Sequence, residues 1–127
     1  MKIFNRDVSV KTLVANAIEM AVGAGVGSSA AVTVNEVSGI ITTEALTTAQ
    51  NAFYSLTLTN SKIDANSLVF ASVEDGTNTQ GTPMIGQIKP GAGTCLIEVI
   101  NKHASSEALN GTLKIRFFVV NPVRVVR

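Results

Sequence analysis

The chain has 127 residues, of which 46% are hydrophobic and only 15% are charged, and its formal net charge is +1. This length favours a single domain whose core is large enough to fold without metals or disulfides. The small net charge argues against a general nucleic-acid binder, because such proteins concentrate basic charge on one surface. An average soluble domain is about 25% charged, so this chain is expected to bury apolar surface against a partner or a second copy.

The first residues predict an extended arm followed by a helix. Residues 1–8 look extended, and Ser9–Val22 carries a helical pattern. Its apolar residues recur on one helix face, at Val10, Leu13, Val14, Ala17, Ile18 and Ala21. Such a helix packs either on its own domain or on a neighbouring subunit. Asn16 and Glu19 interrupt the apolar run, which argues against a secretion signal or a membrane span.

Composition divides the rest of the chain. Gly23–Ser29 is rich in glycine and serine and is expected to act as a flexible hinge. Its glycines match neither the dinucleotide-binding pattern nor the phosphate-loop pattern. We therefore expect an N-terminal part of residues 1–29, a β-sandwich domain of residues 30–120 and a C-terminal tail of residues 121–127.

Residues 30–120 have the pattern of a mainly β domain. The clearest strand is Phe53–Asn60, where Tyr54, Leu56 and Leu58 alternate with serine and threonine. Further strands are expected at residues 31–35, 39–43, 68–74, 83–89, 94–102 and 112–120. Strands and turns at this spacing predict an antiparallel β-sandwich, either immunoglobulin-like or jelly-roll-like. The spacing does not give the strand order.

The last two expected strands place apolar side chains on both faces. Residues 112–120 put Phe118 and Val120 opposite an apolar face formed by Leu113, Ile115, Phe117 and Val119. Residues 94–102 put Leu96 and Ile100 opposite a face formed by Cys95, Ile97 and Val99. A strand that is apolar on both sides is covered on both sides. The expected helix or a partner chain therefore covers the second face.

The sequence predicts no catalytic, metal or cofactor site. His103 is the only histidine and Cys95 the only cysteine, and no Gly-x-Ser-x-Gly motif is present. One histidine, one cysteine and scattered carboxylates lack the spacing of zinc or calcium ligands. Cys95 forms no intrachain disulfide, and its neighbours favour a buried thiol. Few aromatic residues and no tryptophan argue against a sugar-binding or base-stacking platform.

Three stretches resemble the small β-sandwich structural proteins of tailed bacteriophages, especially those of marine cyanobacterial phages. They are GIITTEALTT at residues 39–48, FYSLTLTNS at residues 53–61 and HASSEALNGTLKI at residues 103–115. The likeness runs from about Val32 to about Val120 and rests on strands rich in threonine and asparagine and on an Asn-Gly turn.

The resemblance implies a non-enzymatic head-decoration, cement or knob protein on the capsid surface of the virion, assembled in the host cytoplasm. Its partner would be the major capsid protein, with a homo-oligomer, most simply a trimer, and with no nucleic-acid or membrane partner. The expected capsid or subunit interface comprises Lys2, Phe4, Arg6, Val10, Leu13, Val14, Ile18, Leu96, Ile100, Phe118, Val120, Arg124 and Arg127.

Two other classes stay open at this point. Similar modules occur in phage tails and fibres, so the chain is alternatively an adhesion module that contacts the host surface through the loops at residues 61–66 and 74–81. A secreted or pilus-like bacterial subunit is the third class.

Overall fold

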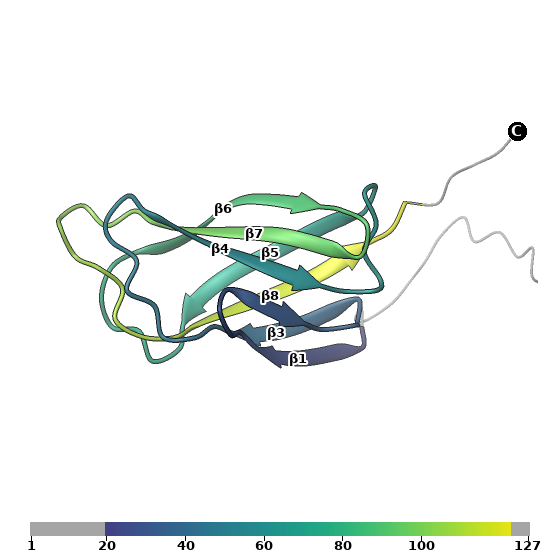
Figure 1. The fold of residues 1–127 in the computed structure, drawn as a ribbon, viewed down its shortest axis with the longest axis horizontal. Helices are drawn as coiled ribbons and strands as arrows, with labels where there is room; N and C mark the ends of the chain where they lie inside the picture. Colours follow the sequence, from purple (N-terminus) through teal and green to yellow (C-terminus); the bar gives the residue numbers. More distant parts are fainter. Residues whose placement is uncertain (1–19, 123–127) are drawn as a thin grey trace, which may run out of the picture.

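The computed structural model describes residues 20–122, which form two four-stranded β-sheets packed face to face (Figure 1). The strands are β1 (Val22–Val26), β2 (Ala31–Thr33), β3 (Ser38–Thr42), β4 (Phe53–Thr59), β5 (Leu68–Asp75), β6 (Pro83–Pro90), β7 (Thr94–Asn101) and β8 (Leu113–Val120). Sheet A has the order β1-β3-β8-β5, and sheet B has the order β2-β4-β7-β6. The expected mainly β, two-sheet architecture is confirmed.

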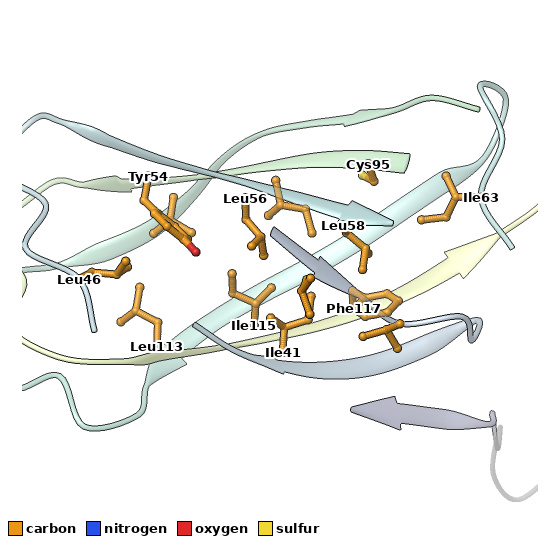
Figure 2. Packing of buried hydrophobic residues seen from close by; sticks show 14 of the residues in the cluster. Ile41, Leu46, Tyr54, Leu56, Leu58, Ile63, Cys95, Leu113, Ile115 and Phe117 are labelled. Atoms are coloured by element: carbon orange, nitrogen blue, oxygen red, sulfur yellow. The ribbon is translucent and has the colours of Figure 1, made fainter. Parts of the chain in front are cut away.

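The core lies between the sheets and is built from every second residue of the central strands (Figure 2). Leu56 and Leu58 of β4 are fully buried and face Ile115 and Phe117 of β8 across the sandwich. The two-residue period of β4 therefore predicted its buried face correctly. Cys95 is also buried, as expected, and its burial raises the pKa of the thiol.

The first two strands break the antiparallel arrangement expected for the whole sandwich. β1 pairs in parallel with β3, and β2 pairs in parallel with β4, while the remaining pairs are antiparallel. The chain crosses from sheet A to sheet B between β1 and β2. Ser29 and Ala30 make this crossing with left-handed φ angles of 51° and 59°.

Residues 23–26 of the stretch expected to be a flexible hinge lie in strand β1, so that expectation is wrong for most of the stretch. Gly23 and Gly25 point toward the core, where a Cβ on Gly23 would lie 2.5 Å from Val34 Cγ1 and one on Gly25 would lie 2.6 Å from Val32 Cγ2. These glycines allow an edge strand to approach the core closely. Composition alone does not separate this use of glycine from a hinge.

The expected helix over Ser9–Val22 is not present where the structure describes it. Met20 and Ala21 are not helical, and Val22 opens β1. Residues 9–19 lie outside the described residues, as do the arm at residues 1–8 and residues 123–127 of the tail.

Asn101, at the end of β7, holds three loops together at one end of the sandwich. Its side chain is fully buried, and its Nδ2 donates to the carbonyl oxygens of Thr48 and Glu107 at 3.0 and 2.8 Å. Its Oδ1 accepts from the backbone N–H groups of Thr82 and His103 at 3.0 and 3.2 Å. The amide therefore uses all of its donor hydrogens and both acceptor positions.

Glu44 links the connection after β3 to β4 and to the turn before β2. Its carboxylate accepts hydrogen bonds from the hydroxyl of Tyr54 and, at 2.8 Å, from the backbone N–H of Ala30. Burial acts to raise the pKa of Glu44, but these hydrogen bonds outweigh it and hold the pKa below its usual value of 4.5. Burial, and then the nearby carboxylate, raises the pKa of Tyr54, so its hydroxyl stays protonated and able to donate.

A pH-dependent contribution to stability follows from Glu44. A carboxyl group whose pKa is lower in the folded state stabilises the fold at pH values above its unfolded pKa, near 4.5. That contribution is lost as the pH falls through the folded pKa. We expect Glu44→Gln to be less stable than the unmodified chain at pH 7, and the difference to shrink at pH 3. Urea unfolding at both pH values measures this, and an unchanged difference would contradict it.

Candidate interaction surface

The outer face of sheet A carries a continuous apolar patch at one end. The strand registers place Val22, Ser38, Phe118 and Phe70 side by side across β1, β3, β8 and β5. The rings of Phe70 and Phe118 stack with their centroids 4.8 Å apart and their planes 16° apart, yet they are 49% and 40% exposed. Stacked aromatic rings on an open surface are typical of a contact site.

The neighbouring residues extend this patch. Val120 and Leu68 lie opposite one another in the next row toward the end of β8, and both are exposed. Ile40 lies in the row on the opposite side of Phe118, where it pairs with Arg116. We call Val22, Ile40, Leu68, Phe70, Phe118 and Val120 the sheet A patch. Two shallow hollows of about 250 and 210 Å³ lie over it, one beside Phe70 and one beside Val22. Each is large enough to hold an apolar side chain.

The other half of the same face is charged. Arg116 Nε and Nη2 both donate to Glu74 Oε1, at 3.0 and 2.8 Å, in an exposed ion pair between β8 and β5. Lys114 lies opposite Glu74 in the following row. The face therefore changes from apolar to charged along β8, and its apolar half lies where β1 begins and β8 ends.

A smaller patch lies on the outer face of sheet B. Phe53, Ile100 and Met84 stand in one row across β4, β7 and β6, and Phe53 is 60% exposed. The next row is polar, with Ser55 opposite Glu98. We call Phe53, Met84 and Ile100 the sheet B patch. An apolar group with polar neighbours has the composition of a protein interface.

The two patches point in different directions. Figure 1 shows β4 and β8 running toward the same end of the molecule. Phe53 begins β4 and Phe118 lies near the end of β8, so the two patches lie at opposite ends as well as on opposite faces.

The interface residues expected from the sequence therefore do not form one surface. Phe118 and Val120 lie in the sheet A patch, and Ile100 lies in the sheet B patch with Leu96 farther along the same face. The remaining expected residues lie outside the described residues: Lys2, Phe4, Arg6, Val10, Leu13, Val14, Ile18, Arg124 and Arg127.

Sequence reasoning missed six patch residues, namely Val22, Ile40, Phe53, Leu68, Phe70 and Met84. The signal for two of them was present, because Leu68 and Phe70 alternate with the inward-facing residues of β5. Phe53 likewise alternates with the buried positions of β4. Their grouping depends on strand order and register, which one sequence does not contain.

The two loops considered for host adhesion lie at opposite ends of β5. Residues 61–66 precede β5, and the loop after Asp75 follows it. A strand of this length separates its ends by about 25 Å. The two loops therefore do not form one contact site.

His103 lies in a cluster with Ser105 and Glu107 that has the residue types of a hydrolase triad. Ser105 Oγ lies 3.2 Å from His103 Nδ1, and Glu107 Oε1 lies 3.7 Å from His103 Nε2. The second distance is too long for a hydrogen bond. Glu107 Oε1 instead accepts from the backbone N–H of Gly81 at 2.7 Å, and the N–H of Ser105 donates to His103 Nδ1 at 3.2 Å. The cluster is a tight turn tied to the β5–β6 loop.

Within residues 20–122, no group of three or more His, Cys, Asp or Glu side chains gathers to hold a metal ion. Over the same residues, no helix is long and apolar enough to cross a membrane. Comparisons with protein-family models, with curated proteins and with solved structures found no match to this chain.

Proposed function

We propose that the chain is a non-enzymatic structural protein of a tailed-phage virion, a decoration or cement protein that binds the major capsid protein at the capsid surface. It acts there as a homo-oligomer, most simply a trimer. The supporting observation is the sheet B patch, in which the exposed Phe53 and Met84 flank the half-buried Ile100 beside a polar row. Phenylalanine and methionine are enriched where protein partners bury surface, and such a protein works by contact area.

The low charge of the chain supports the same proposal. Only 15% of the residues are charged, so the outer faces carry few charged groups that would oppose association with another protein. Binding to a shell would cover these faces and would stabilise the folded state by mass action. The resemblance of residues 39–48, 53–61 and 103–115 to phage structural proteins directs the proposal to a virion.

We also propose that the sandwich is jelly-roll-like rather than immunoglobulin-like. In an immunoglobulin-like sandwich, strands A and B lie in the same sheet. Here the first two strands, β1 and β2, belong to different sheets, as do β3 and β4 and also β4 and β5. The last strand, β8, lies between β3 and β5. Viral capsid domains are among the proteins built as double-sheet jelly rolls, which supports a virion role.

The decisive measurement is the copy number of the chain in purified virions, by quantitative mass spectrometry against the major capsid protein. We expect a number comparable to that of the capsid protein. A few copies per particle would contradict a shell-coating role and would favour the tail or fibre adhesion module.

A substitution tests the surface itself. Phe53→Asp places a charge on the most exposed residue of the sheet B patch and is expected to weaken binding to capsid shells at least tenfold, since an interface anchor contributes about 2 kcal/mol or more. The matched control is Ser55→Asp, which adds the same charge in the polar row of the same strand. Pelleting with purified shells measures both. Equal binding of the two variants would contradict the assignment of this patch.

A further inference from the structure

Strand β1 forms one edge of sheet A, with β3 as its neighbour on the inner side (Figure 1). The N–H of Gly27, directly after β1, donates to the carbonyl oxygen of Thr42 in β3 at 2.7 Å. Because the backbone groups of successive strand residues point to opposite sides, those of Val22, Ala24 and Val26 point away from β3. Within residues 20–122, these three N–H groups and three carbonyl oxygens have no hydrogen-bond partner.

The other edge strands carry features that discourage pairing with a further strand. β6 begins and ends with proline, and its register is irregular between Ile85 and Ile88. β5 ends in two acidic residues. β2 has only three residues, and Ala31 already exchanges backbone hydrogen bonds with Ser28. Prolines, bulges, charges and short strands all protect sheet edges. β1 has a regular register and contains no proline and no charge, so it is the described edge best suited to accept another strand.

The sequence of β1 is symmetric about Ala24. If two β1 strands run antiparallel with Ala24 opposite Ala24 of a second copy, each Val22 stands opposite a Val26. All three pairs then consist of residues whose backbone groups face the partner strand, and such pairs exchange two hydrogen bonds each. This register therefore uses every open N–H and carbonyl group of β1 in both copies.

The side chains of β1 fit the same register on both faces. Val22 and Val26 are 65% and 75% exposed, more than any other exposed large apolar side chain of the described residues. Pairing them across the edge suits β-branched side chains. On the core side, Gly23 would stand opposite Gly25, so no side chain crowds the new pair. Val26 of one copy would also extend the apolar row that contains Val22 and Phe118 in the other.

We propose that two copies of the chain associate by antiparallel pairing of their β1 strands, which joins their A sheets into one continuous sheet of eight strands. A two-fold pairing uses the same surface on both copies and closes with two. Two five-residue edges bury less than the roughly 1,200 Å² of a stable interface, so we expect a dimer that dissociates on dilution. This association concerns the isolated chain and does not rest on the proposed virion function. The trimer proposed there uses other surfaces.

Light scattering on the full chain, diluted from millimolar to micromolar concentration, measures the association. We expect the mass to fall from that of two chains to that of one. Ala24→Pro removes an N–H that points away from β3, and proline is accepted at such edge positions. Because each copy loses one donor at the centre of the pairing, the dissociation constant should rise at least about tenfold.

A pair of charge substitutions separates edge pairing from packing between sheet faces. Ala24→Glu places two carboxylates directly opposite one another across the two-fold axis and should also weaken the dimer. The matched control is Ile40→Glu, since Ile40 lies next to Ala24 in β3 and has Arg116 on its other side. It adds the same charge to the same face, one strand away from the edge, and should leave the dissociation constant unchanged.

Cysteine cross-linking tests the register without disturbing the edge. The native Cys95 is fully buried, so an introduced cysteine is the accessible thiol of the described residues. Ala24→Cys places two thiols opposite one another, where the Cα atoms of a hydrogen-bonded pair are about 5.5 Å apart, a separation that a disulfide spans. With an added oxidant, we expect a covalent dimer. The control Val26→Cys is exposed on the same strand, but its two copies are about 13 Å apart along the strands and should not cross-link.

Three results would overturn the proposal. The first is the mass of a single chain at every concentration. The second is equal cross-linking of Ala24→Cys and Val26→Cys, which would indicate random collision or another register. The third is a dimer that Ile40→Glu disrupts and Ala24→Pro leaves intact, which would assign the association to the face of sheet A. Since the cross-linking does not use the proline variant, the test does not depend on how the fold accepts that substitution.

Discussion

Asn101→Ala is expected to destabilise the fold by about 2–6 kcal/mol, because four hydrogen bonds worth roughly 0.5–1.5 kcal/mol each are lost together. The side chain ties the backbones of Thr48, Thr82, His103 and Glu107 to the end of β7. Without it, the two carbonyl oxygens and two N–H groups lose partners at a place where the loops shut out water. Since a domain of this size is stable by about 5–15 kcal/mol, the loss is a large share of the total.

Urea unfolding followed by circular dichroism measures this effect. The control is Asn66→Ala, at an exposed position in the loop before β5, which is expected to stay within about 0.5 kcal/mol of the unmodified chain. If Asn101→Ala unfolds at the same urea concentration as this control, the loops are held by other contacts and the role given to Asn101 is wrong.

Leu56→Ala is expected to cost about 2–5 kcal/mol, because it removes a fully buried side chain and leaves a cavity between the sheets. Leu56 lies in the middle of β4, which pairs with β7 along its whole length and with β2 from Thr57 onward, so the surrounding structure has little freedom to close the gap. Leu56→Met keeps most of the volume and is expected to cost less than about 1.5 kcal/mol.

Phe53→Ala supplies the comparison on the same strand. Phe53 loses a larger side chain, but that side chain is 60% exposed, so its removal should destabilise the isolated domain much less than Leu56→Ala. The free energies of unfolding of Phe53→Ala and Leu56→Ala, measured under identical conditions, test this expected difference. A larger loss for Phe53→Ala would mean that the sheet B patch stabilises the domain itself rather than serving a partner.

The alternation of apolar and polar residues along the sequence predicted the strands and their buried faces well. β4 and β8 follow it residue by residue, because a sheet that is buried on one side repeats every two residues. Pro83, which has no backbone N–H to donate to a neighbouring strand, agrees with the edge position of β6 in sheet B.

The errors lie where the outcome depends on contacts between distant parts of the chain. Gly23 and Gly25 have the composition of a hinge, and only the positions of Val32 and Val34 beneath them explain why they form a strand. The parallel pairing of β1 and β2 likewise depends on neighbours that come later in the chain.

The sequence predicted only part of the candidate surface, because the surface depends on strand order and register. Sequence periodicity correctly predicted that Phe118 and Ile100 face away from the core. Because strand order is not encoded in spacing, it did not show that these residues occupy opposite outer faces. Phe70, the neighbour of Phe118, comes from a strand distant in the sequence, whereas Met84 comes from β6, the strand directly before that of Ile100.

The place of β8 has a consequence for how the protein is made. Of the described strands, β8 is synthesised last, and it lies in the interior of sheet A, where Phe118 pairs with Ser38 on one side and with Phe70 on the other. Sheet A is therefore incomplete on the ribosome until β8 has left the exit tunnel. Pairings this distant also place folding in the range of about milliseconds to seconds. During that interval β3 and β5 have unpaired edges, so high-level expression is expected to lose material to aggregation at this stage.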